Sequence, residues 1–399
     1  MEIYVVKEGD TLHGIAASFG IADEILIEDN QLVYPYTLVV GQALLVSVNT
    51  SEYSNQDKRS VYVCGYAYPF ISRWVLEQTL EYLTELLVFS YGFTTDGQLI
   101  PPLWEDSWLI EIAVQYGVRP VLVLTPFGPD GRFNNRLISE VVNSEDAMDS
   151  LIESLILIME EKGYVGLDID FEYILAQDRD AFSEFIRRVA DRMRNQGYTT
   201  SVALAPKTSA DQTGLLYSGK DYAALGEAAD HVFLMTYEWG YTYGPPMAVA
   251  PINQVRRVVE YALTEIPMEK IVLGVPNYGY DWPLPYEKGV SRAATLGNIE
   301  AIRIAEKRGA GILFDQIAQS PFFYYSEINY SEDASGDRSV SGTEHEVWFE
   351  DVRSIREKFN LIEQYGLYGC GYWTVMQWFR PNWLLLQDRF LIDKQSGNE

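Results

Sequence analysis

The chain has 399 residues and a formal net charge of −27, with 57 acidic and 30 basic side chains. Its length suits one large domain with a small one beside it. Such an acidic chain argues against binding of nucleic acid or anionic lipid through a basic surface, and no stretch approaches the roughly 18 apolar residues that a membrane span requires.

The first 48 residues are expected to fold as a small unit of two strands and two helices. The first helix follows a turn, with Asp10 or Thr11 as its N-cap, and Gly20 ends it. In chain order, the expected elements are a strand at 3–6, helices at 12–19 and 25–30, and a strand at 44–46.

This unit resembles a LysM module. It carries Tyr-x-Val-x-x-Gly-Asp-Thr-Leu and Ile-Ala-x-x-Phe-Gly, followed by an Asn, a Pro and a Gly-Gln pair at the expected places. The resemblance implies a βααβ fold that binds N-acetylglucosamine-containing glycans such as peptidoglycan or chitin. A purely structural role is the alternative. The residues expected to bind the glycan lie in two loops and are Gly9, Asp10, Thr11, Asn30 and Pro35.

Residues 49–60 are polar and lack an apolar period, which indicates a linker. From 61 to 392, apolar strand-like runs alternate with amphipathic helical stretches, which predicts a (β/α)8 barrel. A doubly wound sheet is the alternative, but no Gly-rich phosphate loop follows the first strand. The eight expected strands are 61–66, 86–91, 120–124, 166–171, 200–205, 231–237, 271–275 and 369–373.

The two cysteines, Cys64 and Cys370, fall in the first and the last of these strands. Because both runs are apolar, buried thiols are expected rather than a disulfide framework. The first and last strands of a barrel are neighbours, but the sequence leaves open whether the two thiols meet.

Three acidic residues in the fourth strand, Asp168, Asp170 and Glu172, are spaced by two within the run from Val165 to Tyr173. Side chains alternate along a strand, so the three are expected on one face. Burial and like charge raise the pKa of at least one carboxyl, which favours a protonated Glu172, as a glycosidase acid requires. A solvated acidic edge or a metal site is the alternative, but the flanks are apolar and the chain has only three histidines.

This run resembles the D-x-x-D-x-D-x-E signature of family 18 glycoside hydrolases, which include chitinases and related N-acetylglucosaminidases. Asp168, Asp170 and Glu172 match its last three positions, and Val165 stands where the first Asp would be. The resemblance implies a barrel that hydrolyses glycosidic bonds by a substrate-assisted route. It also implies that neither a metal nor an organic cofactor takes part.

Other strand ends fit the same family. Tyr237 and Glu238 lie in a segment similar to the family's M-x-Y-D, which implies that Tyr237 contacts the substrate's acetamido group. Trp373 resembles the family's Trp at the floor of the subsite for the reacting sugar. Packing alone is the alternative for the remaining strand-end candidates. The residues expected to bind substrate are Trp373, Glu238, Tyr66, Phe93, Asn277 and Tyr280.

A long excursion of about 281–350 separates the seventh and eighth strands. Within it, 322–330 and 344–349 alternate and are expected to pair across a polar turn at 331–342. It resembles the small α+β insertion of some family members and is expected to form a wall of the cleft. A bare surface hairpin is the alternative.

The resemblance implies a mechanism in which Glu172 protonates the leaving oxygen and the substrate's own acetamido carbonyl attacks the anomeric carbon. Asp170 would stabilise the acetamido nitrogen, Asp168 would tune Asp170 by sharing a proton with it, and Tyr237 would donate to the acetamido oxygen. Water activated by Glu172 would then complete a retaining hydrolysis.

The combination of one LysM unit with this barrel resembles spore cortex-lytic N-acetylglucosaminidases. A secretory signal is not evident at residues 1–4. We therefore expect synthesis in the mother-cell cytoplasm and deposition in spore or cell-wall layers. A chitinase, a catalytically silent glycan-binding barrel and a structural protein of those layers are the alternatives, and the sequence does not predict the oligomeric state.

Overall fold

A computed structural model describes residues 1–48, 58–332 and 338–394. The N-terminal unit is β1 (Glu2–Val5), α1 (Leu12–Phe19), α2 (Asp23–Asp29) and β2 (Ala43–Val46). The two strands pair antiparallel. Thr11 is the N-cap of α1, because its hydroxyl accepts from the Gly14 amide at 3.0 Å, and Gly20 ends the helix at φ 68°. The predicted βααβ fold is confirmed.

A closed barrel of eight parallel strands forms the main body. Each strand pairs with its neighbours in parallel register, and pairing of the first strand with the second closes the ring. The barrel strands are β3 (Ser60–Ala67), β4 (Glu85–Phe93), β6 (Arg119–Leu124), β7 (Gly166–Ile169), β8 (Thr199–Leu204), β9 (His231–Leu234), β10 (Ile271–Pro276) and β16 (Gly369–Trp373). All eight predicted strands are present, and the (β/α)8 prediction is confirmed.

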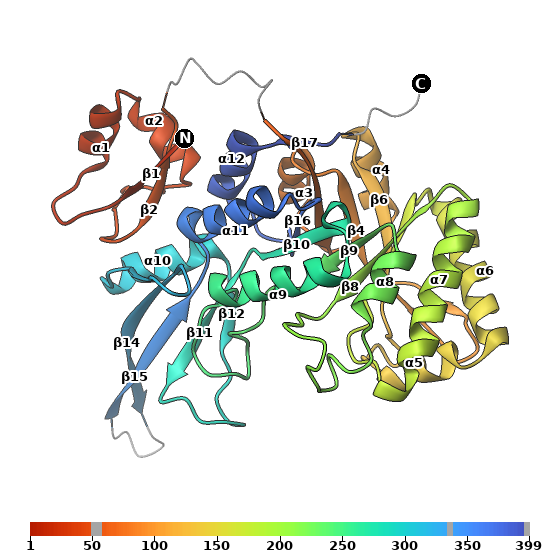
Figure 1. Cartoon of the computed structure of the whole chain (residues 1–399). Helices are drawn as coiled ribbons and strands as arrows, with labels where there is room; N and C mark the ends of the chain where they lie inside the picture. Colours follow the sequence, from red (N-terminus) through yellow and green to blue (C-terminus); the bar gives the residue numbers. More distant parts are fainter. Residues whose placement is uncertain (49–57, 333–337, 395–399) are drawn as a thin grey trace.

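Helices surround the barrel in the alternating order that the sequence predicts (Figure 1). In α6, the Ser144 hydroxyl caps the Ala147 amide, and Gly163 ends the helix at φ 82°. Its apolar face, which includes Leu151 and Leu155, is buried. The surrounding helices are α3 (Arg73–Leu80), α4 (Ser107–Gln115), α5 (Asn135–Val142), α6 (Glu145–Lys162), α7 (Arg179–Asn195), α8 (Tyr222–Ala228), α9 (Ile252–Glu265), α11 (Val352–Tyr365) and α12 (Arg380–Arg389).

Two short strands pair with barrel strands without forming part of the closed ring, and two 3-10 helices precede longer elements. The two-residue strand β5 (Leu99–Ile100) pairs antiparallel with β4, and β17 (Leu391–Ile392) pairs parallel with β3. The 3-10 helices η2 (Ala176–Asp178) and η3 (Met268–Lys270) lead into α7 and β10.

The excursion before β16 folds as a five-stranded antiparallel sheet with α10 (Asn298–Arg308). Its two long strands pair as predicted, with Phe322 opposite Trp348 and their rings stacked at 4.5 Å. A bare hairpin is therefore the wrong interpretation. Part of the predicted turn, 333–337, lies outside the described residues, as does 49–57 of the predicted linker. The sheet strands are β11 (Gly279–Leu284), β12 (Ala294–Leu296), β13 (Leu313–Asp315), β14 (Ser320–Glu332) and β15 (Arg338–Trp348).

The N-terminal unit lies beside α10, α11 and α12 (Figure 1). The Gln31 side chain accepts from the Arg380 amide at 2.6 Å and donates to the Trp378 carbonyl at 3.4 Å. The Ile312 amide donates to the Val40 carbonyl at 2.8 Å. Direct hydrogen bonds therefore join the small unit both to the segment after β16 and to the inserted sheet.

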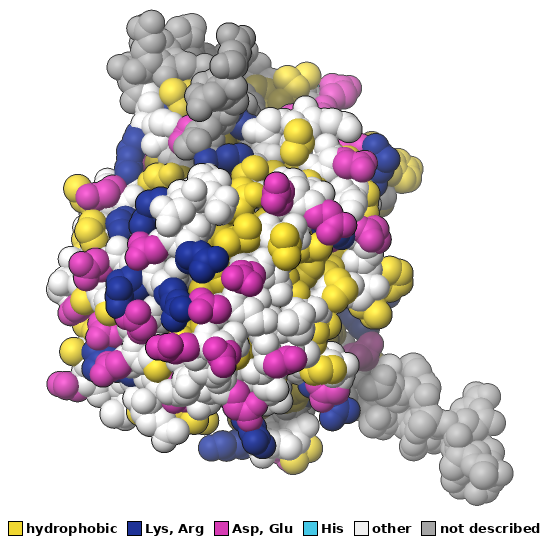
Figure 2. All heavy atoms as spheres, turned by 90° about the vertical axis from the view of Figure 1, so that its right-hand side faces the viewer, with side chains coloured by type: hydrophobic (Ala, Val, Ile, Leu, Met, Phe, Trp, Pro, Cys, Tyr) yellow, Lys and Arg dark blue, Asp and Glu magenta, His cyan; other side chains and the backbone are white. Residues whose placement is uncertain are grey.

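Both cysteines are buried and free, as predicted, on the adjacent strands β3 and β16. The face in Figure 2 mixes acidic, basic and hydrophobic side chains. Within the described ranges, none of the helices combines the length and apolar character that a membrane crossing demands.

Candidate active site

The acidic run lies where β7 ends, at the carboxyl end of the barrel strands. The strand stops at Ile169, two residues earlier than predicted, although the Asp170 amide still donates to the Leu124 carbonyl at 3.0 Å. Asp168 therefore sits within the strand, Asp170 directly follows it, and Glu172 belongs to the segment that leaves the barrel. Chemistry in this fold is placed at these strand ends.

Asp168 is fully buried and accepts two hydrogen bonds. The Tyr66 hydroxyl donates to Oδ2 at 2.8 Å, and the Ser201 hydroxyl donates to Oδ1 at 2.5 Å. Burial raises the pKa of Asp168 to about 6, and these two donors oppose the rise. Two hydroxyls, from Tyr66 on β3 and Ser201 on β8, therefore hold the Asp168 carboxyl in place.

Asp170 is 5% exposed, and its Oδ1 has no hydrogen-bond partner among the described residues. Burial raises its pKa well above the ordinary value, and the charges of Glu172 and Asp168 raise it further. An acceptor atom buried without a donor is costly to folding, so this oxygen is suited to receive a donor from a bound molecule.

Glu172 lines a cavity of about 520 Å³ together with Asp170. Burial raises the pKa of Glu172. The raised pKa favours a protonated carboxyl that can donate to an oxygen in the cavity. The cavity is lined by Tyr66, Asp170, Glu172, Tyr173, Ala205, Pro206, Leu216, Tyr217, Met235, Tyr237, Glu238, Trp239, Tyr241 and Trp373.

Tyr237 and Glu238 enter this cavity from the segment after β9. Glu238 has a left-handed backbone at φ 67°, which is uncommon for a residue with a Cβ. Its carboxylate accepts from the Tyr280 hydroxyl at 2.9 Å and also from the Tyr278 hydroxyl. Burial raises the pKa of Glu238, and the two tyrosine donors lower it.

Trp373 lies at the end of β16 among other aromatic rings. Its ring centroid lies 5.0 Å from Phe89, 5.4 Å from Tyr66 and 6.2 Å from Tyr68, all in edge contact. Trp373 also lines the cavity, and an aromatic ring in a cavity wall is suited to stacking on a sugar ring.

The cavity thus combines buried carboxyls of raised pKa with an aromatic wall, the arrangement of a glycosidase. Comparison with known proteins decides the family. The model for glycosyl hydrolases family 18 matches residues 123–377, and the LysM domain model matches residues 4–47. The chain belongs to glycoside hydrolase family 18.

Relatives of this family 18 hydrolase align over nearly the whole chain. The "Cortical fragment-lytic enzyme" of Bacillus subtilis is 36% identical, covering 99% of this chain and 100% of that protein. The Bacillus subtilis "Putative sporulation-specific glycosylase YdhD" is 33% identical over 98% of this chain and 88% of its own length. The crystal structure of the Bacillus cereus spore cortex-lytic enzyme SleL superposes with a TM-score of 0.89 at 32% identity, covering 99% of both chains.

Three expected sugar contacts of the hydrolase lie outside the cavity lining. Phe93 is fully buried and stacks on Phe171 at 5.3 Å, so it is a core residue. Asn277 is 4% exposed, and its amide donates to the Gln377 carbonyl at 2.8 Å and to the Thr374 carbonyl at 3.2 Å, bracing the loop after Trp373. The Tyr280 hydroxyl donates to Glu238, which lines the cavity, but Tyr280 itself is not part of the lining.

The expected glycan-binding residues of the LysM unit divide in the same way. Asn30 is 4% exposed, and its side chain bonds the Leu45 amide at 2.7 Å and the Leu45 carbonyl at 2.8 Å. It therefore holds the end of α2 against β2 from a buried position. Asp10 accepts from the Lys7 amide at 2.7 Å and shapes the loop, while Gly9 and Pro35 are exposed.

Several cavity residues were missed by the sequence interpretation. Tyr173 and Trp239 directly follow the predicted residues Glu172 and Glu238, and Tyr241 lies two positions beyond Trp239, so their position was a usable signal. Leu216 and Tyr217 come from the loop between β8 and α8. That loop has no periodic pattern, and nothing in the sequence predicted its contact with the cavity.

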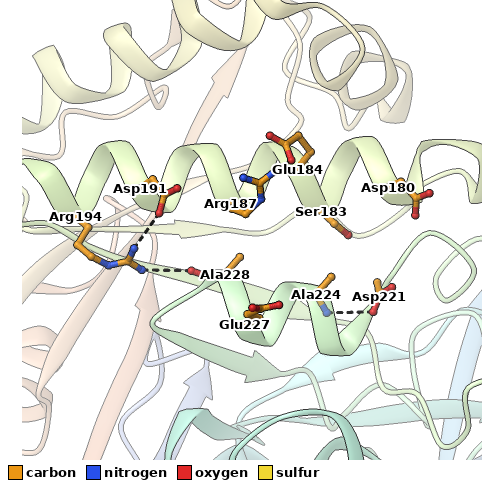
Figure 3. Close-up of a pocket in the computed structure, with 10 residues that line it drawn as sticks. All are labelled: Asp180, Ser183, Glu184, Arg187, Asp191, Arg194, Asp221, Ala224, Glu227 and Ala228. Atoms are coloured by element: carbon orange, nitrogen blue, oxygen red, sulfur yellow. Dashed lines mark hydrogen bonds and ion pairs between the residues drawn. The ribbon is translucent and has the colours of Figure 1, made fainter.

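A second hollow, of about 540 Å³, lies on the helical exterior between α7 and α8 (Figure 3). Its charged side chains pair locally, for example Arg194 with Asp191 at 3.1 Å. No strand end contributes to its lining, so it is a groove between packed helices rather than a second active site. Across the described ranges, no three His, Cys, Asp or Glu side chains are arranged so that they could hold a metal ion.

Proposed function

We propose that this family 18 hydrolase cleaves peptidoglycan fragments of the spore cortex after N-acetylglucosamine, with retention of configuration. The observation that carries the proposal is the buried Oδ1 of Asp170 beside Glu172, which none of the described residues bonds. A 2-acetamido N–H is a donor of the right kind for that oxygen. The names of the cortical fragment-lytic relatives supply the class of glycan.

In the proposed first step, Glu172 gives its proton to the glycosidic oxygen as the bond from that oxygen to the anomeric carbon breaks. The acetamido carbonyl oxygen forms the new bond to that carbon and yields an oxazolinium ion. Asp170 accepts from the acetamido N–H, and its negative charge stabilises the positive charge that develops on the ring. Tyr237, 7% exposed at the cavity wall, donates to the acetamido oxygen.

In the proposed second step, the Glu172 carboxylate takes a proton from water, and the resulting hydroxide adds to the anomeric carbon. The oxazolinium ring opens and the carboxyl is protonated again, so one water is consumed for each bond cleaved. Two displacements at one carbon leave its configuration unchanged. Trp373 supports the ring, and Asp168, held by Tyr66 and Ser201, fixes the strand end beneath Asp170.

The LysM unit is proposed to hold the hydrolase on glycan, through the exposed loop that includes Gly9 and the exposed loop that includes Pro35. Exposed aromatic side chains in the second loop, Tyr34 at 83% and Tyr36 at 37%, suit stacking on sugar rings. We also propose that the hydrolase is deposited in the spore, on the strength of the names of its cortical fragment-lytic relatives.

The substrate-assisted step is tested with two oligosaccharides that differ only in whether the reacting sugar is N-acetylglucosamine or glucose. We expect cleavage of the first and, for the second, a rate lower by at least about 10³-fold, since the internal nucleophile is absent. A stable thiazoline analogue of the intermediate should inhibit. Equal rates on both substrates would rule out acetamido participation.

A further inference from the structure

Lys220 lies in the loop between β8 and α8, and its side chain is buried behind the acidic segment. The residue is 1% exposed. Its Nζ donates to the Phe171 carbonyl at 2.5 Å and to the Ala203 carbonyl at 3.0 Å. Phe171 separates Asp170 from Glu172 in the chain, so one ammonium group binds the peptide between the two acidic side chains.

We propose that Lys220 is a positioning residue for the glycosidase reaction, which fixes the peptide carrying Asp170 and Glu172 and supplies the positive charge that faces both. This inference rests on the roles proposed above for Asp170 and Glu172. It adds a group that no sequence pattern indicated.

The loop around Lys220 is packed closely onto the segment that follows Glu172. A Cβ on Gly219 would lie 2.4 Å from the Ile174 carbonyl oxygen, so only glycine allows this approach. On the other side, Lys207 Nζ donates to the Lys220 carbonyl at 3.1 Å. The backbone of Lys220 is thus held from two sides, which directs its side chain beneath the acidic residues.

The charges around Lys220 fit this role. Asp168, Asp170 and Glu172 face it from β7 and the segment beyond. Burial raises the pKa of all three carboxyls, and the charge of Lys220 opposes the rise in each. Burial lowers the pKa of Lys220 to about 8 while the three carboxylates raise it, so the ammonium form prevails below that pH.

The far side of Lys220 faces a separate cavity of about 320 Å³ with charges of both signs, contributed by Arg179, Lys207, Asp211, Asp221 and Glu265. Lys207 itself lies over the Tyr222 and Tyr261 rings at 5.8 and 5.9 Å. The pKa of Lys207 is lowered by burial and by Arg179, and Asp221 and Glu265 oppose this. Lys207 is therefore a buried neighbour whose charge faces groups other than the catalytic carboxylates.

The first experiment measures kcat/KM against pH for the full chain and for Lys220→Met, with soluble peptidoglycan fragments as substrate. Removing the positive charge raises the pKa values of the nearby carboxyls, so the midpoint of the acidic limb should rise by about one pH unit or more. At a pH one unit below the wild-type midpoint, the rate should fall by at least about tenfold, mainly in kcat.

Lys358→Met is the matched control, since it removes an equally buried lysine whose charge pairs with Glu350 at 2.8 Å rather than with the acidic segment. It should lower Tm and leave the acidic limb in place. Lys220→Gln retains a hydrogen-bond donor without the charge and should show the same shift as Lys220→Met. An acidic limb unchanged in both Lys220 variants, with a lower Tm only, would reduce Lys220 to a structural residue and overturn the proposal.

A second measurement works even if the Lys220 variants fail to fold. NMR titration of the lysine side chains compares the wild type with Glu172→Gln. Loss of the Glu172 charge should lower the pKa of Lys220, because the coupling between two sites is reciprocal. An unchanged Lys220 titration contradicts the proposal. If the pKa of Lys220 differs between the two proteins but the wild type cleaves no glycan, the proposed function is contradicted, whereas the pairing of Lys220 with Glu172 is supported.

Discussion

The carboxyl group of Asp170 carries the main energetic conflict at the scale of single residues. It is buried beside two other carboxyls, and its Oδ1 has no partner among the described residues. Such an arrangement is unfavourable for the folded chain, and the acetamido N–H of the proposed substrate would relieve it. The same feature that weakens the empty site therefore prepares it for the proposed substrate.

Asp170→Asn should stabilise the protein near neutral pH. The folded pKa of Asp170 is raised above its ordinary value of 3.8. Its contribution to stability is thus fully present below about pH 3.8 and is lost as pH rises through the folded pKa. The Tm of the variant should exceed that of the wild type by a few degrees at pH 7, with the difference vanishing toward pH 3.5. Thermal scans across pH check this, and a variant less stable at pH 7 contradicts it.

Glu172→Gln should abolish turnover and keep glycan binding. The amide cannot donate a proton to the leaving oxygen, so kcat should fall by about 10³-fold or more. Circular dichroism and titration with a fragment should match the wild type. Retention of more than about a tenth of the wild-type rate would remove Glu172 from the acid role.

Residue types at strand ends were predictable, but the directions of their side chains were only partly so. The period-two spacing placed Asp168 and Asp170 correctly at the end of β7. Phe93 was chosen only because it lies at the end of the second strand. Every residue of β4 is buried, and a strand buried on both sides gives no pattern from which to choose a face. Lys220 had no signal in the sequence, since its hydrogen-bond partners are the backbone carbonyls of Phe171 and Ala203.

At the scale of elements, the start of α11 joins the inserted sheet to the barrel. Glu350 and Lys358 form a buried ion pair at 2.8 Å, with side-chain exposures of 0% and 1%. The Glu350 amide donates to the Asn298 side chain at the start of α10 at 3.0 Å. The position of the insertion therefore depends on a paired charge inside the protein.

Lys358→Met should destabilise the fold by about 3–5 kcal/mol, because it leaves the Glu350 carboxylate buried without its cation. The double variant Glu350→Gln, Lys358→Met removes both charges and should recover most of that loss. Urea unfolding followed by tryptophan fluorescence measures both. A double variant as unstable as the single one would show that the pair acts through packing rather than charge.

The helices and strands themselves followed from periodicity, which is strong where each element buries one face or lies wholly in a core. The inserted strands β14 and β15 were predicted because each alternates along its length. The segments that the sequence could not resolve are loops, above all the one between β8 and α8. Its contacts with the cavity depend on tertiary packing, which leaves no local pattern.

At the scale of the whole molecule, the LysM unit packs against the catalytic domain at the inserted sheet and α11. Gly41 has φ 86°, and a Cβ there would lie 1.8 Å from the Ile312 carbonyl oxygen of the inserted domain. Arg353 Nη2 also donates to the Gly41 carbonyl at 3.1 Å. These contacts were not predictable from a sequence that separates the two units by a polar segment.

Gly41→Ala should disturb this contact and lower Tm more than Gly9→Ala. The two glycines have nearly equal φ angles, 86° and 84°, but a Cβ on Gly9 meets nothing within 4 Å. Both alanine variants strain the backbone, but only Gly41→Ala disturbs the contact between the units. The difference between their Tm values therefore measures that contact. Increased proteolysis between the units should accompany Gly41→Ala. Equal losses of Tm in both variants would show that the units do not stabilise each other.

Deletion of residues 1–48 should weaken capture on insoluble peptidoglycan by about tenfold or more, since the tether to glycan is lost. The kcat on soluble fragments should stay within about twofold, because no LysM residue lines the cavity. Sedimentation with cortex material and soluble-fragment kinetics measure the two effects. A matching fall in both would mean that the LysM unit contributes to the active site itself.

Product analysis by mass spectrometry tests the central claim most directly. Wild type and Glu172→Gln are each incubated with spore cortex fragments and, separately, with chitin oligosaccharides. We expect the wild type alone to release cortex products that end in N-acetylglucosamine. Cleavage of chitin oligosaccharides only would contradict the proposed substrate, and binding of both glycans without any cleavage would contradict the hydrolase mechanism.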